Sequence, residues 1–134
     1  MARVFNTNLE KATINNNNYR KVIYTSSDKH MQLVLMSLKP KEEIGKEIHP
    51  KTIQFFRIEQ GNGIAIIGNR EIKLTDGSLL IVPANTYHNI INTGDTDLKL
   101  YTIYIPAHHP DKLVQVIKIE DKGGKSIARG YKIH

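Results

Sequence analysis

Between residues 53 and 105 the chain falls into short runs of β-branched and aromatic residues, each closed by a turn signal. The runs have the sequences IQFFRIE, IAII, EIKL, SLLIV, YHNIIN and LKLYTIYI. Glycine, asparagine and aspartate stand between them, and these residues favour the backbone conformations that turns require. Strands this short and this closely spaced predict an all-β barrel or sandwich. They leave no room for a long amphipathic helix.

The flanking segments carry weaker signals. Residues 20–25 and 32–38 are typical of two further strands, while four consecutive asparagines at 15–18 favour a loop. Residues 111–116 are compatible with a helical turn or with another strand. The last dozen residues are compatible with a mobile tail or with a strand added to a neighbour.

The length and composition favour one domain with one core. The chain has 134 residues, of which 40 % are hydrophobic. There is no cysteine, so a metal ion would have to be held by histidine, carboxylate or amide groups. The expected organisation is a single domain over 1–134, with a barrel at about 30–107, an N-terminal arm at 1–19 and a C-terminal tail at 108–134.

Hydropathy and charge narrow the expected partners. No stretch approaches the roughly 18 consecutive apolar residues that span a membrane, and the first ten residues lack the apolar run of a secretory signal. We therefore expect a cytoplasmic protein with no membrane partner. The formal net charge is +6, but residues 47–110 carry five basic and six acidic side chains. The dispersed lysines favour a solvated surface over a nucleic-acid interface, and they leave attraction for anionic small molecules open.

Residues 77–92 have a distinctive spacing of glycine, proline, histidine and asparagine. Gly77 is followed after five residues by Pro83, after four more by His88 and after three more by Asn92. A second spacing precedes it, in which Glu47, His49, Gln54 and Gly61 are separated by one, four and six residues.

Together the two segments resemble the paired signature of the cupin superfamily. In that signature the first segment contains His, His and Glu at the positions held here by Glu47, His49 and Gln54. Both substitutes, Glu47 and Gln54, carry oxygen atoms that can bind a divalent metal ion. The second segment differs only at Asn85, which stands in place of a glycine. Asparagine tolerates the left-handed backbone conformation well, so we expect the turn to be kept.

The resemblance covers about residues 32–105 and implies a cupin jelly-roll antiparallel β-barrel, often a homodimer. It implies one divalent metal ion held by Glu47, His49, Gln54 and His88. Residues 101–111 are similar to the ending of one group of small bacterial cupins, often labelled mannose-6-phosphate isomerase-related, and this label expresses kinship more than substrate. Some small cupins that act on sugar acids from pectin also have glutamine at the third ligand position.

Strand geometry supports the same four residues. Residues two apart on a strand face the same side, so Glu47 and His49 can both point into the barrel. Gln54 begins the next strand, and His88 comes from a distant one. Two imidazoles, one carboxylate and one amide oxygen suit Zn, Ni, Mn or Fe(II). Any one of these residues alone would more often be a satisfied or solvated polar side chain. Glu47 is either a ligand or a base beside a metal with three protein ligands.

Strand alternation also predicts which side chains line the cavity. Phe56 should face inward, and Lys99 should face water, which turns the residues at 102 and 104 inward. Tyr104 is equally compatible with a core position in which its hydroxyl group is satisfied. The pair at 108–109 is either a lip over the cavity or a simple loop. The predicted substrate-lining residues are Phe56, Thr102 and Tyr104.

Three functions follow from such a site. A metal ion could act as a Lewis acid on a small sugar, sugar acid or keto acid, in isomerase or lyase chemistry, with Glu47 or Tyr104 moving a proton. Two histidines and one carboxylate also suit an Fe(II)-dependent dioxygenase. The third alternative is a cupin that binds a small molecule and catalyses nothing. A barrel with no metal remains the simplest competing hypothesis.

Overall fold

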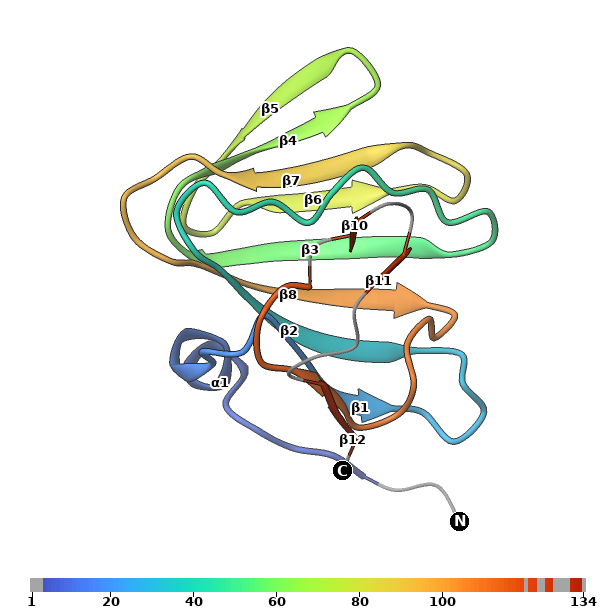
Figure 1. Ribbon diagram of the computed structural model, residues 1–134. Helices are drawn as coiled ribbons and strands as arrows, with labels where there is room; N and C mark the ends of the chain where they lie inside the picture. The colour runs from blue at the N-terminus through green and yellow to red at the C-terminus, as the bar shows by residue number, and fades with distance from the viewer. Residues whose placement is uncertain (1–3, 120, 123–124, 127–130, 134) are drawn as a thin grey trace.

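Short strands and one short helix make up the chain in the computed structural model, which describes residues 4–119, 121–122, 125–126 and 131–133. The elements in chain order are α1 (Leu9–Asn15), β1 (Arg20–Thr25), β2 (Gln32–Leu38), β3 (Ile53–Gln60), β4 (Gly63–Ile67), β5 (Arg70–Leu74), β6 (Leu79–Val82), β7 (His88–Asn92), β8 (Leu98–Ile105), β9 (Leu113–Gln115), β10 (Asp121–Lys122), β11 (Lys125–Ser126) and β12 (Tyr131–Ile133). The fold is the predicted all-β jelly roll (Figure 1).

Two antiparallel sheets form the jelly roll. The larger has the strand order β12-β9-β1-β2-β8-β3-β6 and the smaller has the order β5-β4-β7. Strands β10 and β11 pair with each other. Neighbours in each sheet are often far apart in sequence, so that the long pairing of β2 with β8 joins residues 32–38 to 98–104.

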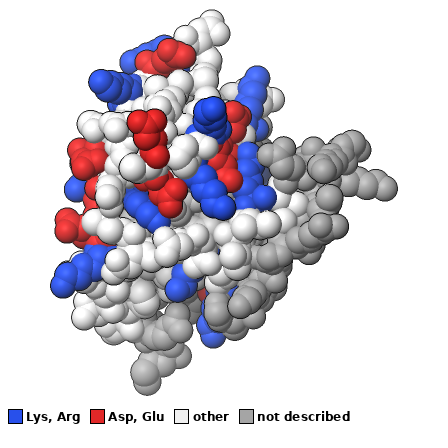
Figure 2. All heavy atoms as spheres, turned by 60° about the vertical axis from the view of Figure 1, so that its left-hand side comes forward, with Lys and Arg blue, Asp and Glu red and all other residues white. Residues whose placement is uncertain are grey.

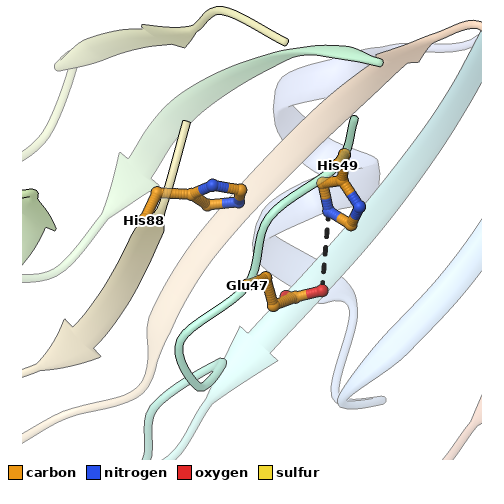
Figure 3. A group of neighbouring side chains, drawn as sticks. All are labelled: Glu47, His49 and His88. Atoms are coloured by element: carbon orange, nitrogen blue, oxygen red, sulfur yellow. Dashed lines mark ion pairs between the residues drawn. The ribbon is translucent and has the colours of Figure 1, made fainter. Parts of the chain in front are cut away.

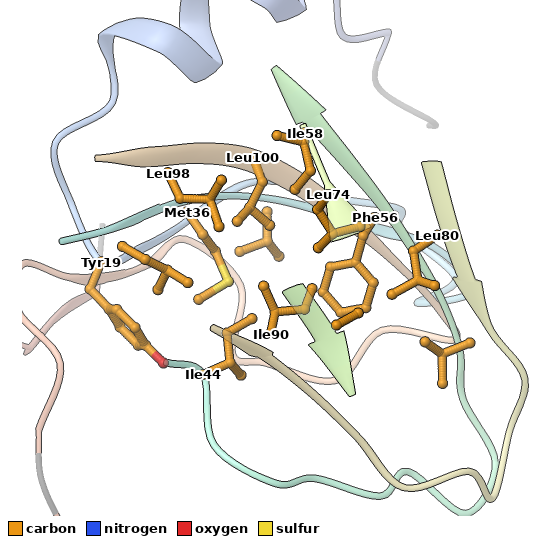
Figure 4. Close-up of a cluster of buried hydrophobic side chains, with 14 of the residues drawn as sticks. Tyr19, Met36, Ile44, Phe56, Ile58, Leu74, Leu80, Ile90, Leu98 and Leu100 are labelled. Carbon is orange, nitrogen blue, oxygen red and sulfur yellow. The ribbon is translucent and has the colours of Figure 1, made fainter. Parts of the chain in front are cut away.

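Alternating burial along the central strands places the core between the two sheets. On β3 the even-numbered residues 54, 56 and 58 are buried, and on β8 the residues 98, 100, 102 and 104 are buried. The core also includes Ala65, Leu74 and Ile90 from the smaller sheet (Figure 4). A chain with a strand period of two therefore builds one apolar interior from the inward faces of both sheets.

The segment that links β2 to β3 runs beside β7 and extends the smaller sheet. Glu43 forms an isolated antiparallel bridge with Ile91, and Glu47 forms another with His88. Between them the Ile44 N–H donates to the Ile90 carbonyl oxygen over 2.9 Å. This pairing brings the first of the two sequence motifs against the second.

Two features differ from the sequence-based expectation. The N-terminal arm contains α1, whose first turn is capped by the Asn8 side chain, which accepts from the Lys11 N–H over 2.9 Å.

Lys99, expected to face water, is only 7 % exposed. Its Nζ instead donates to the Asn16 carbonyl oxygen over 2.6 Å. It also donates to Asn17 Oδ1 and to Ser37 Oγ, each over 3.0 Å. The segment that follows α1 therefore covers this lysine and, together with Ser37 of β2, satisfies its three N–H donors.

The C-terminal region adds strands to the larger sheet. Of the two alternatives for residues 111–116, the strand is the one observed, as β9, which pairs with β1. In the predicted tail, β12 pairs with β9 of the same chain. Residues 120, 123–124, 127–130 and 134 of that tail lie outside the described residues.

Charged side chains of both signs lie close together on the face drawn in Figure 2, and no single sign dominates that face. Mixed charge of this kind suits a solvated surface. Among the described residues, no helix combines the length and the apolar character needed to cross a bilayer.

Candidate metal centre

Main-chain hydrogen bonds join the two sequence motifs. The Glu47 N–H donates to the His88 carbonyl oxygen and the His88 N–H donates to the Glu47 carbonyl oxygen, both over 2.9 Å. A third bond runs from the Asn85 N–H to the His49 carbonyl oxygen over 2.8 Å. Asn85 has a φ of +61°, the left-handed conformation expected at this position. The backbone thus places Glu47, His49 and His88 together before any side chain is considered.

The side chains of these three residues converge on one point. One ligand atom from each of Glu47, His49 and His88 lies within 4.8 Å of the other two. Figure 3 shows His88 reaching from β7 toward Glu47 and His49, which come from the segment before β3. Glu47 Oε2 lies 3.5 Å from His49 Nε2, an ion-pair distance that makes no hydrogen bond. This is a set of two imidazoles and one carboxylate.

A hydrogen bond at Nδ1 orients the ring of His88. Nδ1 lies 3.0 Å from the Thr86 carbonyl oxygen, which can only accept a hydrogen bond. Nδ1 therefore carries the proton, and Nε2 is left with a free lone pair. Nε2 is buried and has no hydrogen-bond partner. A histidine that binds a metal is usually held in this way by a carbonyl oxygen on its far nitrogen.

His49 is prepared for the same role by burial. It is 7 % exposed, and its Nε2 also lacks a hydrogen-bond partner. Burial lowers the pKa of His49 below its usual range, and the charges of His88 and Arg20 lower it further. The imidazole is therefore neutral at neutral pH, the form that binds a metal ion.

Gln54, the fourth predicted ligand, points into the barrel from β3. Its Nε2 donates to Thr102 Oγ1 over 3.0 Å, which fixes the orientation of the amide. The opposite atom, Oε1, is buried and has no hydrogen-bond partner. Gln54 is 2 % exposed, so water does not satisfy this oxygen at the surface.

Unpartnered buried atoms are concentrated among the predicted ligands. Five buried side-chain nitrogen or oxygen atoms of the described residues lack a hydrogen-bond partner, and three of them are Nε2 of His49, Nε2 of His88 and Oε1 of Gln54. A buried polar atom without a partner costs about 1–3 kcal/mol. Three lone pairs left open inside one barrel fit a metal ion, because a cation satisfies all of them together.

The predicted lining residues are all buried in the barrel. Phe56 and Tyr104 are each 1 % exposed, and Thr102 is 0 % exposed. The Phe56 ring centroid lies 6.0 Å from that of His88, and the Tyr104 ring centroid lies 5.9 Å from that of His49. Burial raises the pKa of Tyr104 above its usual range, so its hydroxyl group stays protonated. Their role toward a substrate stays a prediction.

The loop at 106–110 lies against the candidate ligands. The sequence left open whether its histidine pair forms a lip over the cavity or a simple loop. The His108 ring centroid is 4.3 Å from that of His49 and 5.5 Å from that of Tyr104. His109 Nε2 shares a hydrogen bond with the Tyr104 hydroxyl group over 3.2 Å. Burial lowers the pKa of His109 to about 2 and also lowers that of His108, so both rings are neutral. Adjacent histidines were the only signal for this contact, because the loop reaches the site through tertiary packing alone.

Comparisons with known proteins agree with this geometry. Residues 34–104 match the family model described as "Cupin domain". The chain is 48 % identical over 134 residues to uncharacterized protein L612 of Acanthamoeba polyphaga mimivirus, covering 97 % of this chain and 82 % of that protein. It is 47 % identical over 122 residues to uncharacterized protein YrkC of Bacillus subtilis, covering 87 % of this chain but only 64 % of YrkC.

A solved structure has the same fold. The crystal structure of BH2720 from Bacillus halodurans superposes with a TM-score of 0.81 at 39 % identity, covering 85 % of this chain and 89 % of that one. The family match spans more than half of the chain, and its span contains Gln54 and His88 together with the core strands. By its sequence motifs, its jelly roll and these relatives, the chain belongs to the cupin family.

Proposed function

We propose that this cupin binds one divalent metal ion through Glu47, His49, Gln54 and His88, and that the site acts on or binds a small sugar, sugar acid or keto acid. The observation that carries the proposal is the set of three buried, unpartnered atoms on His49, Gln54 and His88. The convergence of the Glu47 carboxylate with the two imidazoles supports it. The mixed nitrogen and oxygen donors suit Zn, Ni, Mn or Fe(II).

The chain's own side chains supply the remaining chemistry. When bound, the metal ion would act as a Lewis acid that polarises a carbonyl or hydroxyl group. If the metal has only the other three protein ligands, Glu47 is the base: its side chain is 26 % exposed, so it can reach an entering molecule and accept a proton from it. Tyr104 keeps its proton and can donate a hydrogen bond to an oxygen atom of that molecule. Phe56 and His108 exclude water on two sides of the ligand cluster. Isomerase or lyase chemistry fits these roles.

An Fe(II)-dependent dioxygenase is the second candidate. The observation that favours it is the composition of the cluster, since Glu47, His49 and His88 are two histidines and one carboxylate. Gln54 and His108 would then border the positions left open. Oxygen consumption in the presence of Fe(II) and a keto acid separates this candidate from Lewis-acid chemistry.

Elemental analysis of protein purified without chelators tests the metal centre. The wild type should contain about one equivalent of a transition metal, and both His49→Ala and His88→Ala should lose it, because each removes a nitrogen ligand. His30→Ala is the matched control, since the His30 side chain is 81 % exposed beside Asp28 and is not one of the candidate ligands. Metal retained by both His49→Ala and His88→Ala would remove the proposed centre.

Turnover of sugar acids and keto acids then separates an enzyme from a binding protein. Defined metals are loaded into the wild type, and each compound is followed for conversion and for thermal stabilisation. Stabilisation without conversion would identify a non-catalytic small-molecule-binding cupin, because a ligand that binds only the folded state raises the melting temperature.

We also propose that the chain forms a homodimer through an outer apolar patch. The patch consists of Ile53, Leu79, Ile81 and Ile105, which are 45–55 % exposed. Residues 53 and 105 are paired across β3 and β8, while Leu79 and Ile81 lie on the adjoining edge strand β6. These four side chains are apolar and uncharged, so two copies can bury them against each other.

The dimer is tested by the mass in solution. The wild type should sediment as a dimer, and Ile81→Glu should sediment at the 15.2 kDa of one chain. Val4→Glu is the control, because Val4 is 92 % exposed and lies outside the patch. A wild type that is monomeric at all concentrations would reject the dimer. The cytoplasmic location stays a prediction from the sequence.

A further inference from the structure

Arg20 is a cation on the inner face of the larger sheet. It opens β1 and is paired with Met36 of β2 and with Gln115 of β9. Residues paired directly across an antiparallel sheet share a face. Met36 is fully buried in the core, and so is Val22, two residues further along β1. The Arg20 side chain therefore starts from the barrel-facing side of the sheet.

Among the described residues, the guanidinium group of Arg20 contacts neutral groups. Nη1 donates to Gln115 Oε1 over 2.6 Å, and the guanidinium carbon lies 5.1 Å from the Tyr19 ring centroid. Nε is buried and has no hydrogen-bond partner. Among the described residues, no carboxylate lies within 4.0 Å of this arginine. A partly desolvated cation without a counter-ion is costly.

Two other basic groups of the larger sheet have a carboxylate nearby. Arg57, on the outer face of β3, pairs with Glu59 over 2.8 Å. Lys99 is satisfied by three oxygen acceptors and has Asp97 at 3.8 Å. Arg20 differs from both in facing the interior with no carboxylate partner among the described residues. A cation kept in this state is typical of a site where the ligand brings the anion.

The charge of Arg20 acts on the same groups that surround the candidate metal centre. Burial is the main cause of the low pKa of His109, and the Arg20 charge is the next. The same charge contributes, after larger causes, to the lowered pKa of His49 and of His108. It also opposes the rise in the pKa of Tyr104. The Arg20 charge therefore acts on these side chains, and the pairing of Arg20 with Met36 places it on the barrel-facing side of the larger sheet.

We propose that Arg20 is the specificity-determining residue that binds the carboxylate or phosphate group of the small molecule at this site. Its open Nε donor and its charge together fit an oxyanion, which a guanidinium group binds through charge-assisted hydrogen bonds. The ligand class is therefore anionic, and a neutral sugar is excluded as the preferred ligand. This inference rests on the small-molecule site proposed above.

Matched pairs of probes test the inference by thermal stabilisation and calorimetry. D-galacturonate is compared with D-galactose, and D-glucose 6-phosphate with D-glucose, on the wild type with and without added Zn. At least one anion should bind better than its neutral counterpart, and added salt should weaken that preference. The pair that shows the preference identifies the oxyanion as carboxylate or phosphate. Arg20→Gln should weaken binding of that anion by at least about tenfold, as expected for lost charge-assisted hydrogen bonds.

Two further variants make the result specific. Arg20→Lys keeps the charge and should retain part of the preference, while losing the planar donor geometry. Arg57→Gln removes the same charge from the outer face and should bind the anion as the wild type does. A wild type that prefers neither anion overturns the inference, and so does an Arg20→Gln variant that keeps the preference. Metal content is measured on the same samples, so a wild type without metal would reject the proposed metal centre while the Arg20 comparison still decides the inference.

Discussion

Gln32 and His109, 77 residues apart, exchange two hydrogen bonds. Gln32 Nε2 donates to the His109 carbonyl oxygen over 2.8 Å, and Gln32 Oε1 accepts from the His109 N–H over 2.9 Å. Oε1 also accepts from the His108 N–H over 3.1 Å, and Nε2 donates to Thr25 Oγ1 over 2.9 Å. One fully buried side chain on β2 therefore holds the loop that packs against the candidate ligand His49.

Replacing this side chain should affect both stability and metal binding. Gln32→Leu leaves the two loop N–H groups and one carbonyl oxygen without partners, which should cost about 2–4 kcal/mol of unfolding free energy. The loosened loop should weaken metal binding by about tenfold, the usual effect of losing a residue that orients a ligand. Urea unfolding of the metal-free protein and a Co(II) titration measure the two effects.

The matched control for this substitution is Thr25→Val. It removes only the hydrogen bond to Thr25 and leaves the three bonds from Gln32 to the loop in place. It should lower stability by about 1 kcal/mol and leave the Co(II) affinity and absorption spectrum unchanged. Equal losses of metal affinity in Gln32→Leu and Thr25→Val would show that the loop does not support the site.

Gln54 should contribute to metal affinity through its oxygen atom. Gln54→Leu removes the unpartnered Oε1 and should weaken metal binding by at least about tenfold, while relieving a buried unsatisfied atom. The metal-free protein should therefore be as stable as the wild type or more stable, because an apolar group of similar shape replaces the orphaned amide. Thr102→Val should weaken binding less, since it removes only the acceptor that orients the amide. A metal-free Gln54→Leu protein that is less stable, with unchanged affinity, would make Gln54 a structural residue.

Lys99 gives the protein a pH dependence of known sign. Burial lowers the pKa of Lys99 below its ordinary value of 10.5, and the nearby Asp97 only partly opposes this. Between the lowered folded pKa and 10.5 the unfolded chain binds more protons than the folded one, so the contribution of Lys99 to stability rises with pH in that window. The difference in unfolding free energy between the wild type and Lys99→Met should grow as the pH is raised toward 10.5. At lower pH the difference should be constant, and a difference that shrinks with rising pH would contradict the assignment.

Asn92, the last residue of the second motif, should be structural. Its Nδ2 donates to the Leu38 and Thr96 carbonyl oxygens, both over 2.9 Å, and its Oδ1 accepts from the Gly94 N–H over 2.9 Å. Asn92→Ala leaves three backbone groups without this partner, of which the Leu38 carbonyl oxygen is buried, and should lower the unfolding free energy by about 2–3 kcal/mol. Metal content should stay at the wild-type level, because Asn92 belongs to the β7 turn and not to the ligand cluster. Loss of metal from a folded Asn92→Ala protein would contradict this division of roles.

The parts of the fold that follow from local pattern could be predicted from the sequence. The strand period of two is visible in residues 53–105 and predicted an all-β barrel or sandwich, while the jelly roll was implied by the resemblance to cupins. The convergence of Glu47, His49 and His88 was also predictable, because fixed spacings place them at matching points of paired segments. The left-handed Asn85 was anticipated because asparagine, which tolerates this conformation, stands where the cupin signature has a glycine.

The parts that depend on distant contacts could not be predicted in the same way. Lys99 was wrongly expected to face water, because the residues that cover it lie more than 80 positions earlier in the chain. Helix α1 has only seven residues, too few for a helical period to stand out. The hydrogen bonds from Gln32 to His109 and from Arg20 to Gln115 join residues 77 and 95 positions apart, and no local spacing encodes such pairs.

Glu47 and His88 are held next to each other by reciprocal main-chain hydrogen bonds. Their placement therefore does not depend on which side chains they carry. Since peptide groups hold these positions in register, a new side chain at 47 inherits the same origin and direction. A histidine or an aspartate there would change which ion is preferred without relocating the pocket. A single substitution could thus change the metal preference during evolution. A site built on flexible loops would not keep its ligands in place through such a change.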